Sequence, residues 1–159
     1  MAMINYIYCG LICVGITFAI LSTTGNYWFK ASNSSEHGGI WYFCKLNGCE
    51  KRLNKADSLI ATETFMIMGC LSYFLAFVLS LLSCSKILKS HKISAAVLCV
   101  TALFLVIGLG VFTKKFHGMG VLKYSWSYMI GWSSVGISII SAILCFVMKM
   151  DNQLAYSAF

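Results

Sequence analysis

The segment WFKASNSSEHGGIWYFCKLNGC, residues 28–49, decides the fold, because it is a polar loop with paired cysteines between two apolar runs. The dipeptide Asn47-Gly48 favours a tight turn, and the β-branched and aromatic residues at 40–43 suit a strand. A hairpin on that turn would place Cys44 and Cys49 opposite each other at bridging distance. We therefore predict a hairpin stapled by a Cys44–Cys49 disulfide.

The composition places the chain in a membrane. Of its 159 residues, 59% are hydrophobic and 11% charged, the mean hydropathy is +0.81 and there is no proline. Four runs, at about residues 4–24, 62–84, 93–113 and 126–148, can cross a hydrocarbon core of about 30 Å as helices. The first run has no Lys or Arg before Lys30 and is too long for a signal peptide, so we expect it to remain as a span. The chain is predicted to be one four-span domain covering residues 1–159.

The connecting segments predict which side of the membrane each part faces. A count of Lys and Arg would put the longer loops, 25–61 and 114–125, inside. The turn at 85–92 argues the opposite, because it holds three Lys and no acid beside two spans. The first loop also carries the cysteine pair and a sequon at Asn33, which are features of the exoplasmic side. We predict that the turn, both termini and the tail at 149–159 are cytoplasmic, and that Asn33 is a candidate N-glycosylation site.

The other cysteines and the small residues have separate roles. A metal site would need more ligands than the two loop thiols, and His37 alone does not supply them. Cys84 and Cys145 lie near predicted cytoplasmic span ends and are candidates for S-palmitoylation.

Two ladders of small residues predict close helix packing, within the bundle or between protomers. They are Gly15, Ala19 and Thr23, and Ser134, Ser138 and Ala142.

The motif Trp28, Gly39, Trp41, Cys44 and Cys49 resembles the Trp, Gly-Leu-Trp, Cys, Cys signature of a superfamily. Its members are claudins, peripheral myelin protein 22, epithelial membrane proteins and lens fibre membrane proteins. Residues 61–67 and 124–132 look more like the lens fibre, claudin-domain-containing and natural killer cell granule members than the true claudins. The resemblance implies an all-α membrane protein with a small β cap. Its fold would be a left-handed four-helix bundle capped by an extracellular antiparallel sheet built mainly from the first loop.

The resemblance also sets limits. The two tryptophans are expected to anchor the sheet to the bundle. The cysteine spacing is closer than in true claudins, Glu63 stands where an Arg is usual, and the C-terminal ending differs. Formation of strands along a tight-junction pore therefore does not follow. Glu63, at the start of the second span, is expected to be structural, since a carboxylate at a helix N-terminus is favoured by the helix dipole.

The polar residues do not form a catalytic set. The five acids and three histidines are scattered, with no nucleophile and base, no metal spacing and no phosphate-binding loop. We expect no enzymatic activity, no cofactor, no metal and no nucleic-acid partner.

Two functions remain open. The first is cell–cell contact or junction organisation through the stapled loop, at the plasma membrane. The alternative is an accessory protein that regulates trafficking or gating of a channel, receptor, or vesicle or granule component in the same membrane. Expected partners are membrane lipids, further copies of the chain, other membrane proteins, and a PDZ scaffold at Ser157-Ala158-Phe159. The candidate contact residues are basic: Lys51, Arg52, Lys55, Lys114, Lys115 and Lys123.

Overall fold

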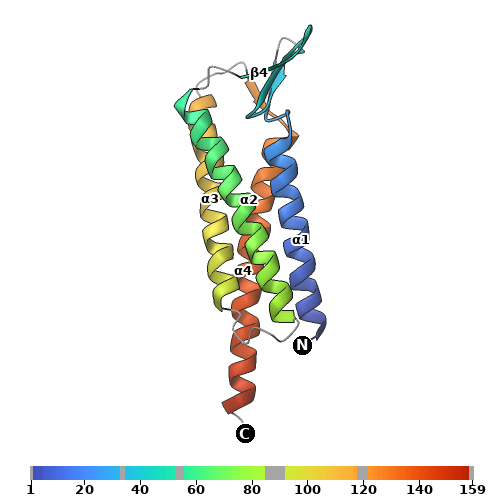
Figure 1. The fold of residues 1–159 in the computed structure, drawn as a ribbon, viewed down its shortest axis with the longest axis vertical. Helices are drawn as coiled ribbons and strands as arrows, with labels where there is room; N and C mark the ends of the chain where they lie inside the picture. Colours follow the sequence, from blue (N-terminus) through green and yellow to red (C-terminus); the bar gives the residue numbers. More distant parts are fainter. Residues whose placement is uncertain (1, 33–34, 53–55, 85–91, 118–121, 158–159) are drawn as a thin grey trace.

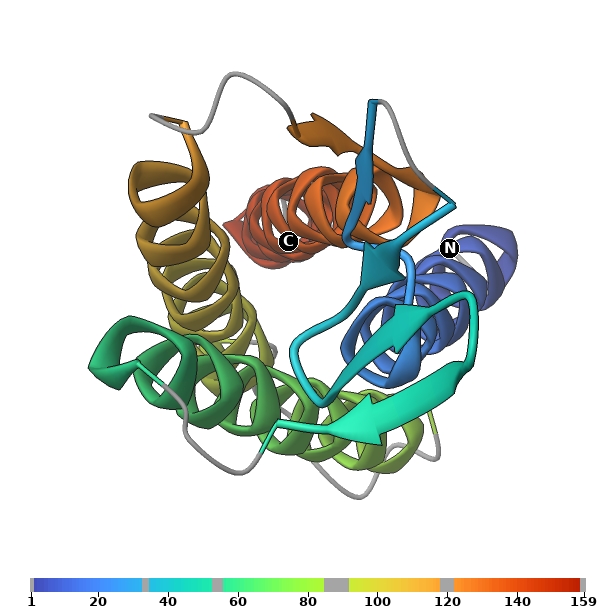
Figure 2. The ribbon, with the colours of Figure 1, turned by 90° about the horizontal axis from the view of Figure 1, so that it is seen from above.

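Four long helices form the body of the molecule. The computed structural model describes residues 2–32, 35–52, 56–84, 92–117 and 122–157. The helices are α1 (Ala2–Thr24), α2 (Asp57–Cys84), α3 (Lys92–Phe116) and α4 (Trp126–Ser157). They surround a common core in which α1 contacts α2 and α4, and α3 contacts the same two helices (Figures 1 and 2). Each contains a stretch long and apolar enough to cross a membrane, so the predicted four-helix architecture is confirmed.

Three helix ends differ from the predicted spans by three residues or more, because hydropathy locates an apolar run rather than a helix. Helix α2 begins at Asp57 instead of residue 62, and an acid in the first turn is favoured by the helix dipole. Helix α3 continues past residue 113 to Phe116, with Lys114 and Lys115 in its last turn, where the dipole favours cations. Helix α4 continues to Ser157, through most of the segment predicted as a tail, which contains no Gly or Pro to end it.

A small antiparallel sheet covers one end of the bundle. Its strands are β1 (Phe29–Ala31), β2 (His37–Gly38), β3 (Tyr42–Lys45), β4 (Gly48–Lys51) and β5 (Leu122–Tyr124), in the order β4-β3-β2-β1-β5. The predicted first-loop sheet is confirmed, and the loop between α3 and α4 adds the edge strand β5 to it. Helix α1 begins, and helix α4 ends, at the opposite end of the bundle (Figure 1).

The small-residue ladders pack inside the bundle. Tyr73 of α2 is fully buried, and its hydroxyl donates to the Ser134 carbonyl of α4 at 3.2 Å. Gly15 of α1 makes room for this ring, since a Cβ there would overlap the Tyr73 hydroxyl. Ala19 and Ser138 are also completely buried. Of the two alternatives left open by the sequence, packing within the bundle is therefore the one observed.

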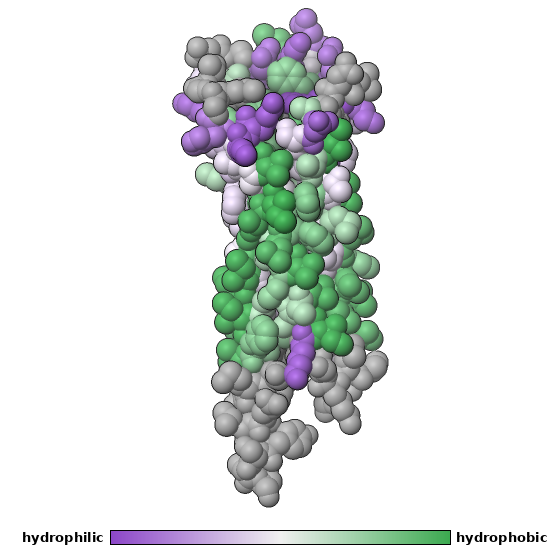
Figure 3. Space-filling view, turned by 90° about the vertical axis from the view of Figure 1, so that its left-hand side faces the viewer, coloured by the Kyte–Doolittle hydropathy of each residue, from purple (hydrophilic) through white to green (hydrophobic). Residues whose placement is uncertain are grey.

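The outer surface of the helices is apolar. Large hydrophobic side chains face outward on all four helices, including Tyr6, Leu71, Leu103 and Met129. Figure 3 shows this apolar wall along the bundle, with hydrophilic residues gathered at the sheet end. An apolar exterior suits contact with lipid tails, while the helices satisfy their own backbone groups internally.

Candidate functional site

The hairpin of β3 and β4 carries the predicted disulfide. Cys44 and Cys49 are register partners across the two strands and their sulfurs are bonded. The turn consists of Leu46 and Asn47, and Gly48 follows as the first residue of β4 with a φ of 135°, a value that favours glycine. The turn therefore begins one residue earlier than the Asn-Gly dipeptide suggests. Leu46 is 83% exposed at the tip of the hairpin.

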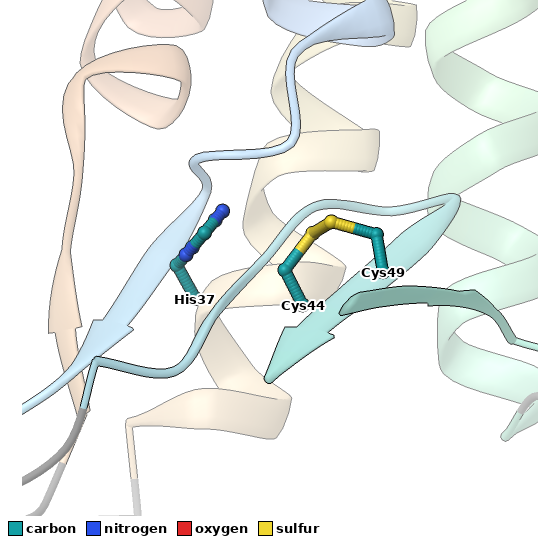
Figure 4. Close-up of side chains that lie close together, drawn as sticks. All are labelled: His37, Cys44 and Cys49. Atoms are coloured by element: carbon teal, nitrogen blue, oxygen red, sulfur yellow. A yellow bond between two sulfur atoms is a disulfide. The ribbon is translucent and has the colours of Figure 1, made fainter. Parts of the chain in front are cut away.

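His37 lies beside this disulfide. It pairs with Cys44 across β2 and β3, and one of its ring nitrogens and both sulfurs lie within 4.8 Å of one another (Figure 4). Such a group resembles a metal site, but cysteine binds zinc as a thiolate, and these two sulfurs are bonded to each other. The His37 ring instead stacks on Tyr27, with ring centroids 4.1 Å apart and planes 4° from parallel. In the disulfide-bonded form, His37 therefore packs against the Tyr27 ring and lies beside the disulfide.

The two signature tryptophans cap the end of α1. The last carbonyls of a helix lack helical partners. At the end of α1 the Leu21 carbonyl still accepts from the Gly25 N–H at 3.0 Å, so the carbonyls of residues 22–24 need other donors. The Trp28 indole N–H donates to the Ser22 carbonyl at 2.7 Å, and the Trp41 indole N–H donates to the Thr23 carbonyl at 2.7 Å. Trp28 is fully buried, and its ring packs edge-on against Phe112 of α3. The tryptophans thus tie the sheet to the bundle, which confirms the predicted anchoring role.

Gly39 of the signature allows two backbone segments to approach. A Cβ at this position would lie 2.5 Å from the Gly25 carbonyl oxygen and 2.9 Å from the Asn26 Cα. The Gly39 N–H donates to the Tyr42 carbonyl at 2.9 Å, which closes the turn into β3. Glycine is therefore required here because the connection after α1 runs directly beneath the sheet.

Arg52 occupies an inward position rather than the outer surface expected of a contact residue. Its guanidinium carbon lies 5.4 Å from the Phe29 ring centroid and 5.5 Å from the Phe43 ring centroid. Burial lowers the pKa of the Arg52 guanidinium, and the nearby charge of Glu63 raises it. Glu63 lies beyond the first turn of α2 and is only 8% exposed. The charge of Arg52, the residue that follows β4, therefore interacts electrostatically with that of Glu63 in α2.

The outward face of the sheet is basic. Lys30 of β1 lies opposite Lys123 of β5 on one side and His37 of β2 on the other. Residues directly opposite in a sheet share a face, and like charges in that position repel. Both lysines are exposed. This face therefore carries a positive charge that disfavours contact with a second basic face.

The other predicted contact residues that the structure describes lie on different elements. Lys51 is exposed on β4, at one edge of the sheet, whereas Lys123 is on β5 at the other edge. Lys114 and Lys115 are exposed at the end of α3. Lys55 and the sequon residue Asn33 lie outside the described residues, as does the very C-terminus of the predicted PDZ ligand.

Of the two candidate palmitoylation sites, the structure describes the side chain of Cys145 only. Cys84 is the last residue of α2, and its side chain lies outside the described part of the chain, so acylation there stays a prediction. Cys145 belongs to the buried core of the bundle and is only 1% exposed. A buried thiol can be acylated only after local opening of the helices, so the position of Cys145 disfavours the predicted modification.

Sequence reasoning missed Leu46 and Lys30 as surface features. Leu46 is an apolar residue directly before Asn-Gly, where turn residues are usually polar, and that mismatch was the available signal. Lys30 directly follows the buried Phe29, and successive side chains of a strand point to opposite faces, so Lys30 belongs to the outward face.

The amino-acid sequence is similar to those of several known proteins. The chain is 27% identical over 150 residues to lens fiber membrane intrinsic protein from Homo sapiens, covering 84% of this chain and 86% of the relative. It is 27% identical over 150 residues to epithelial membrane protein 1 from Homo sapiens, covering 88% and 95%. It is 25% identical over 131 residues to claudin domain-containing protein 2 from Mus musculus, covering 81% and 76%.

The match to a family model is more extensive than the signature motif alone. The model described as the PMP-22/EMP/MP20/Claudin family matches residues 2–145, which include α1, α2, α3, the sheet and α4 as far as Cys145. The capping tryptophans, Gly39 and the disulfide thus lie within the matched region. The chain belongs to the PMP-22/EMP/MP20/Claudin family of membrane proteins.

Proposed function

We propose that this protein is a non-enzymatic membrane protein that forms cell–cell contacts through its disulfide-stapled loop. In this proposal the sheet faces the outside of the cell, and both termini face the cytoplasm. The observation that carries it is the hairpin tip, where Leu46 is 83% exposed on a hairpin closed by the Cys44–Cys49 disulfide. An exposed apolar side chain on a preorganised loop can be buried against a partner with little loss of conformational entropy.

The hairpin also offers an edge strand. Every residue of β4 is exposed, and β4 has a strand neighbour on one side only. Such an edge can pair with an added strand through backbone hydrogen bonds. The basic outward face, with Lys30 and Lys123, would repel the same face of a second copy. Contact between two copies is therefore expected to use the Leu46 tip and the β4 edge.

The test is a mixed culture of cells that lack junctions, in which tagged expressing cells meet both expressing and non-expressing neighbours. The measurement is the ratio of tagged protein at the two kinds of border. Leu46→Asp should bring this ratio to about one. Asn47→Asp is the matched control, since it adds the same charge to the same turn and keeps Leu46. It should retain the enrichment.

A double variant, Cys44→Ser with Cys49→Ser, should also lose the enrichment, because the hairpin would no longer be held in one conformation. A uniform distribution of well-folded wild-type protein would contradict the proposal. An enrichment that Leu46→Asp does not reduce would contradict the role of the tip. Cross-linking to channels, receptors or vesicle proteins of the same membrane would then test the accessory role.

A further inference from the structure

A groove lies between α2 and α3, on the half of the bundle away from the sheet. It has a volume of about 490 Å³. Its lining includes Leu75 of α2 and four residues of α3, which are Lys92, Ile93, Ala96 and Val100. From Lys92 to Val100 it follows α3 for about 12 Å, at 1.5 Å per residue. This length is shorter than one leaflet, because a whole hydrocarbon core is about 30 Å thick.

The groove lining is apolar except at Lys92 and Ser72. Its other polar lining residue, Ser72, donates a hydrogen bond to the Gly69 carbonyl and accepts one from the Thr101 hydroxyl, each at 3.0 Å. These bonds occupy the Ser72 hydroxyl within the bundle. Leu75, Ile93 and Val100 are all exposed, so the groove opens to the surroundings of the bundle. Its body is therefore suited to a hydrocarbon chain.

Lys92 gives the groove a charged end. It is the first residue of α3, and a cation at a helix N-terminus is disfavoured by the helix dipole. Helix stability therefore does not explain a lysine at this position. In the sequence no acid stands between Glu63 and Asp151, and Lys86 and Lys89 precede Lys92. An anion at this end of the groove would find a positive potential.

We propose that the groove between α2 and α3 binds an acyl chain of an anionic phospholipid, with the lipid headgroup paired to Lys92. The acyl chain would lie along Ile93, Ala96 and Val100. The headgroup would sit at the level of the first turn of α3, in the leaflet on the side of the chain termini. Basic sites between membrane-spanning helices are suited to such lipids, since the charge and the chain are recognised together.

The test uses the purified full chain in detergent, with native mass spectrometry of bound lipid. The probes are dioleoyl phosphatidylserine and dioleoyl phosphatidylcholine, which have the same acyl chains. The wild type should retain one phosphatidylserine about fivefold more tightly than phosphatidylcholine, the factor expected for one lysine near a membrane surface. Lys92→Gln should remove this preference and leave weaker binding of both lipids.

Two variants fill the groove: Ala96→Trp and Ile93→Trp, both at exposed positions of α3. Each should abolish the tight site for both lipids. Leu103→Trp is the control for bulk on the same helix, and Lys123→Gln is the control for loss of an exposed lysine. Both should bind as the wild type does, and a detergent unfolding curve checks that every variant is folded.

Equal retention of the two lipids by the wild type would overturn the proposal, as would a preference that neither Lys92→Gln nor the filling variants reduce. Displacement of the bound phosphatidylserine by cholesterol at an equal concentration would identify a sterol site instead and would also overturn it. None of these readouts depends on cell contact.

Discussion

The capping of α1 by the two tryptophans predicts a specific order of stability losses. In Trp28→Phe the Ser22 carbonyl loses its donor, which is 2.7 Å away, inside a fully buried site. An unsatisfied buried acceptor costs about 1–3 kcal/mol. The smaller ring also loses packing against Phe112, for which we add about 1 kcal/mol. The expected loss for Trp28→Phe is therefore about 2–4 kcal/mol.

Trp41→Phe removes a bond of the same length, from the Trp41 indole to the Thr23 carbonyl, but at a half-buried ring. Water can replace part of that bond, so we expect a loss of about 0.5–1.5 kcal/mol. Trp126→Phe is the control, since Trp126 is 48% exposed and stacks on Tyr27 through its ring. Its cost should stay below about 0.5 kcal/mol.

The assay is unfolding of each variant in mixed micelles as the fraction of denaturing detergent rises, followed by circular dichroism. The slope of each transition must match that of the wild type for the free energies of unfolding to be comparable. If Trp28→Phe costs no more than Trp126→Phe, the bond to the Ser22 carbonyl contributes nothing to stability. A greater loss for Trp41→Phe than for Trp28→Phe would also contradict the predicted order.

Three further predictions concern the sheet. Replacing Cys44 and Cys49 by Ser should destabilise the hairpin by about 2 kcal/mol, at the low end for a disulfide because the closed loop is very short. Hydrogen exchange at the β3 and β4 amides measures this loss without unfolding the helices. Gly39→Ala should lower the midpoint of detergent unfolding, since its Cβ would lie 2.5 Å from a carbonyl oxygen, whereas Gly10→Ala, with nothing within 4 Å, should not. A double-mutant cycle of Arg52→Met and Glu63→Gln should give a coupling free energy of about 1 kcal/mol, and additive losses would show that the two charges do not interact.

The sequence predicted the parts of the fold that depend on local patterns. The four apolar runs could be read as helices because their length alone matches a bilayer. The hairpin could be read because Asn-Gly, the strand-forming residues and the two cysteines lie within a few positions of one another. The helix ends were less accurate, since Asp57 and Lys114 stabilise helix termini without being apolar.

The features that the sequence did not reveal depend on residues far apart in the chain. The addition of β5 requires Lys123 to meet Lys30 across the sheet. The inward position of Arg52 requires Phe29 and Phe43 to share one face, so that a residue taken for a surface cation becomes part of the packing. The partners of the indole N–H groups are backbone carbonyls, which carry no signal in the sequence at all.

The most direct test of the proposed contact uses two populations of vesicles that both carry the purified chain, each labelled with a different dye. Protease accessibility of the first loop first establishes the fraction of chains with the sheet outward. If the Leu46 tip forms the contact, the two populations should cluster together only when both carry the chain. Leu46→Asp should abolish this clustering, and Asn47→Asp should retain it. Vesicles that carry outward sheets and do not cluster, or that cluster equally with Leu46→Asp, would contradict it.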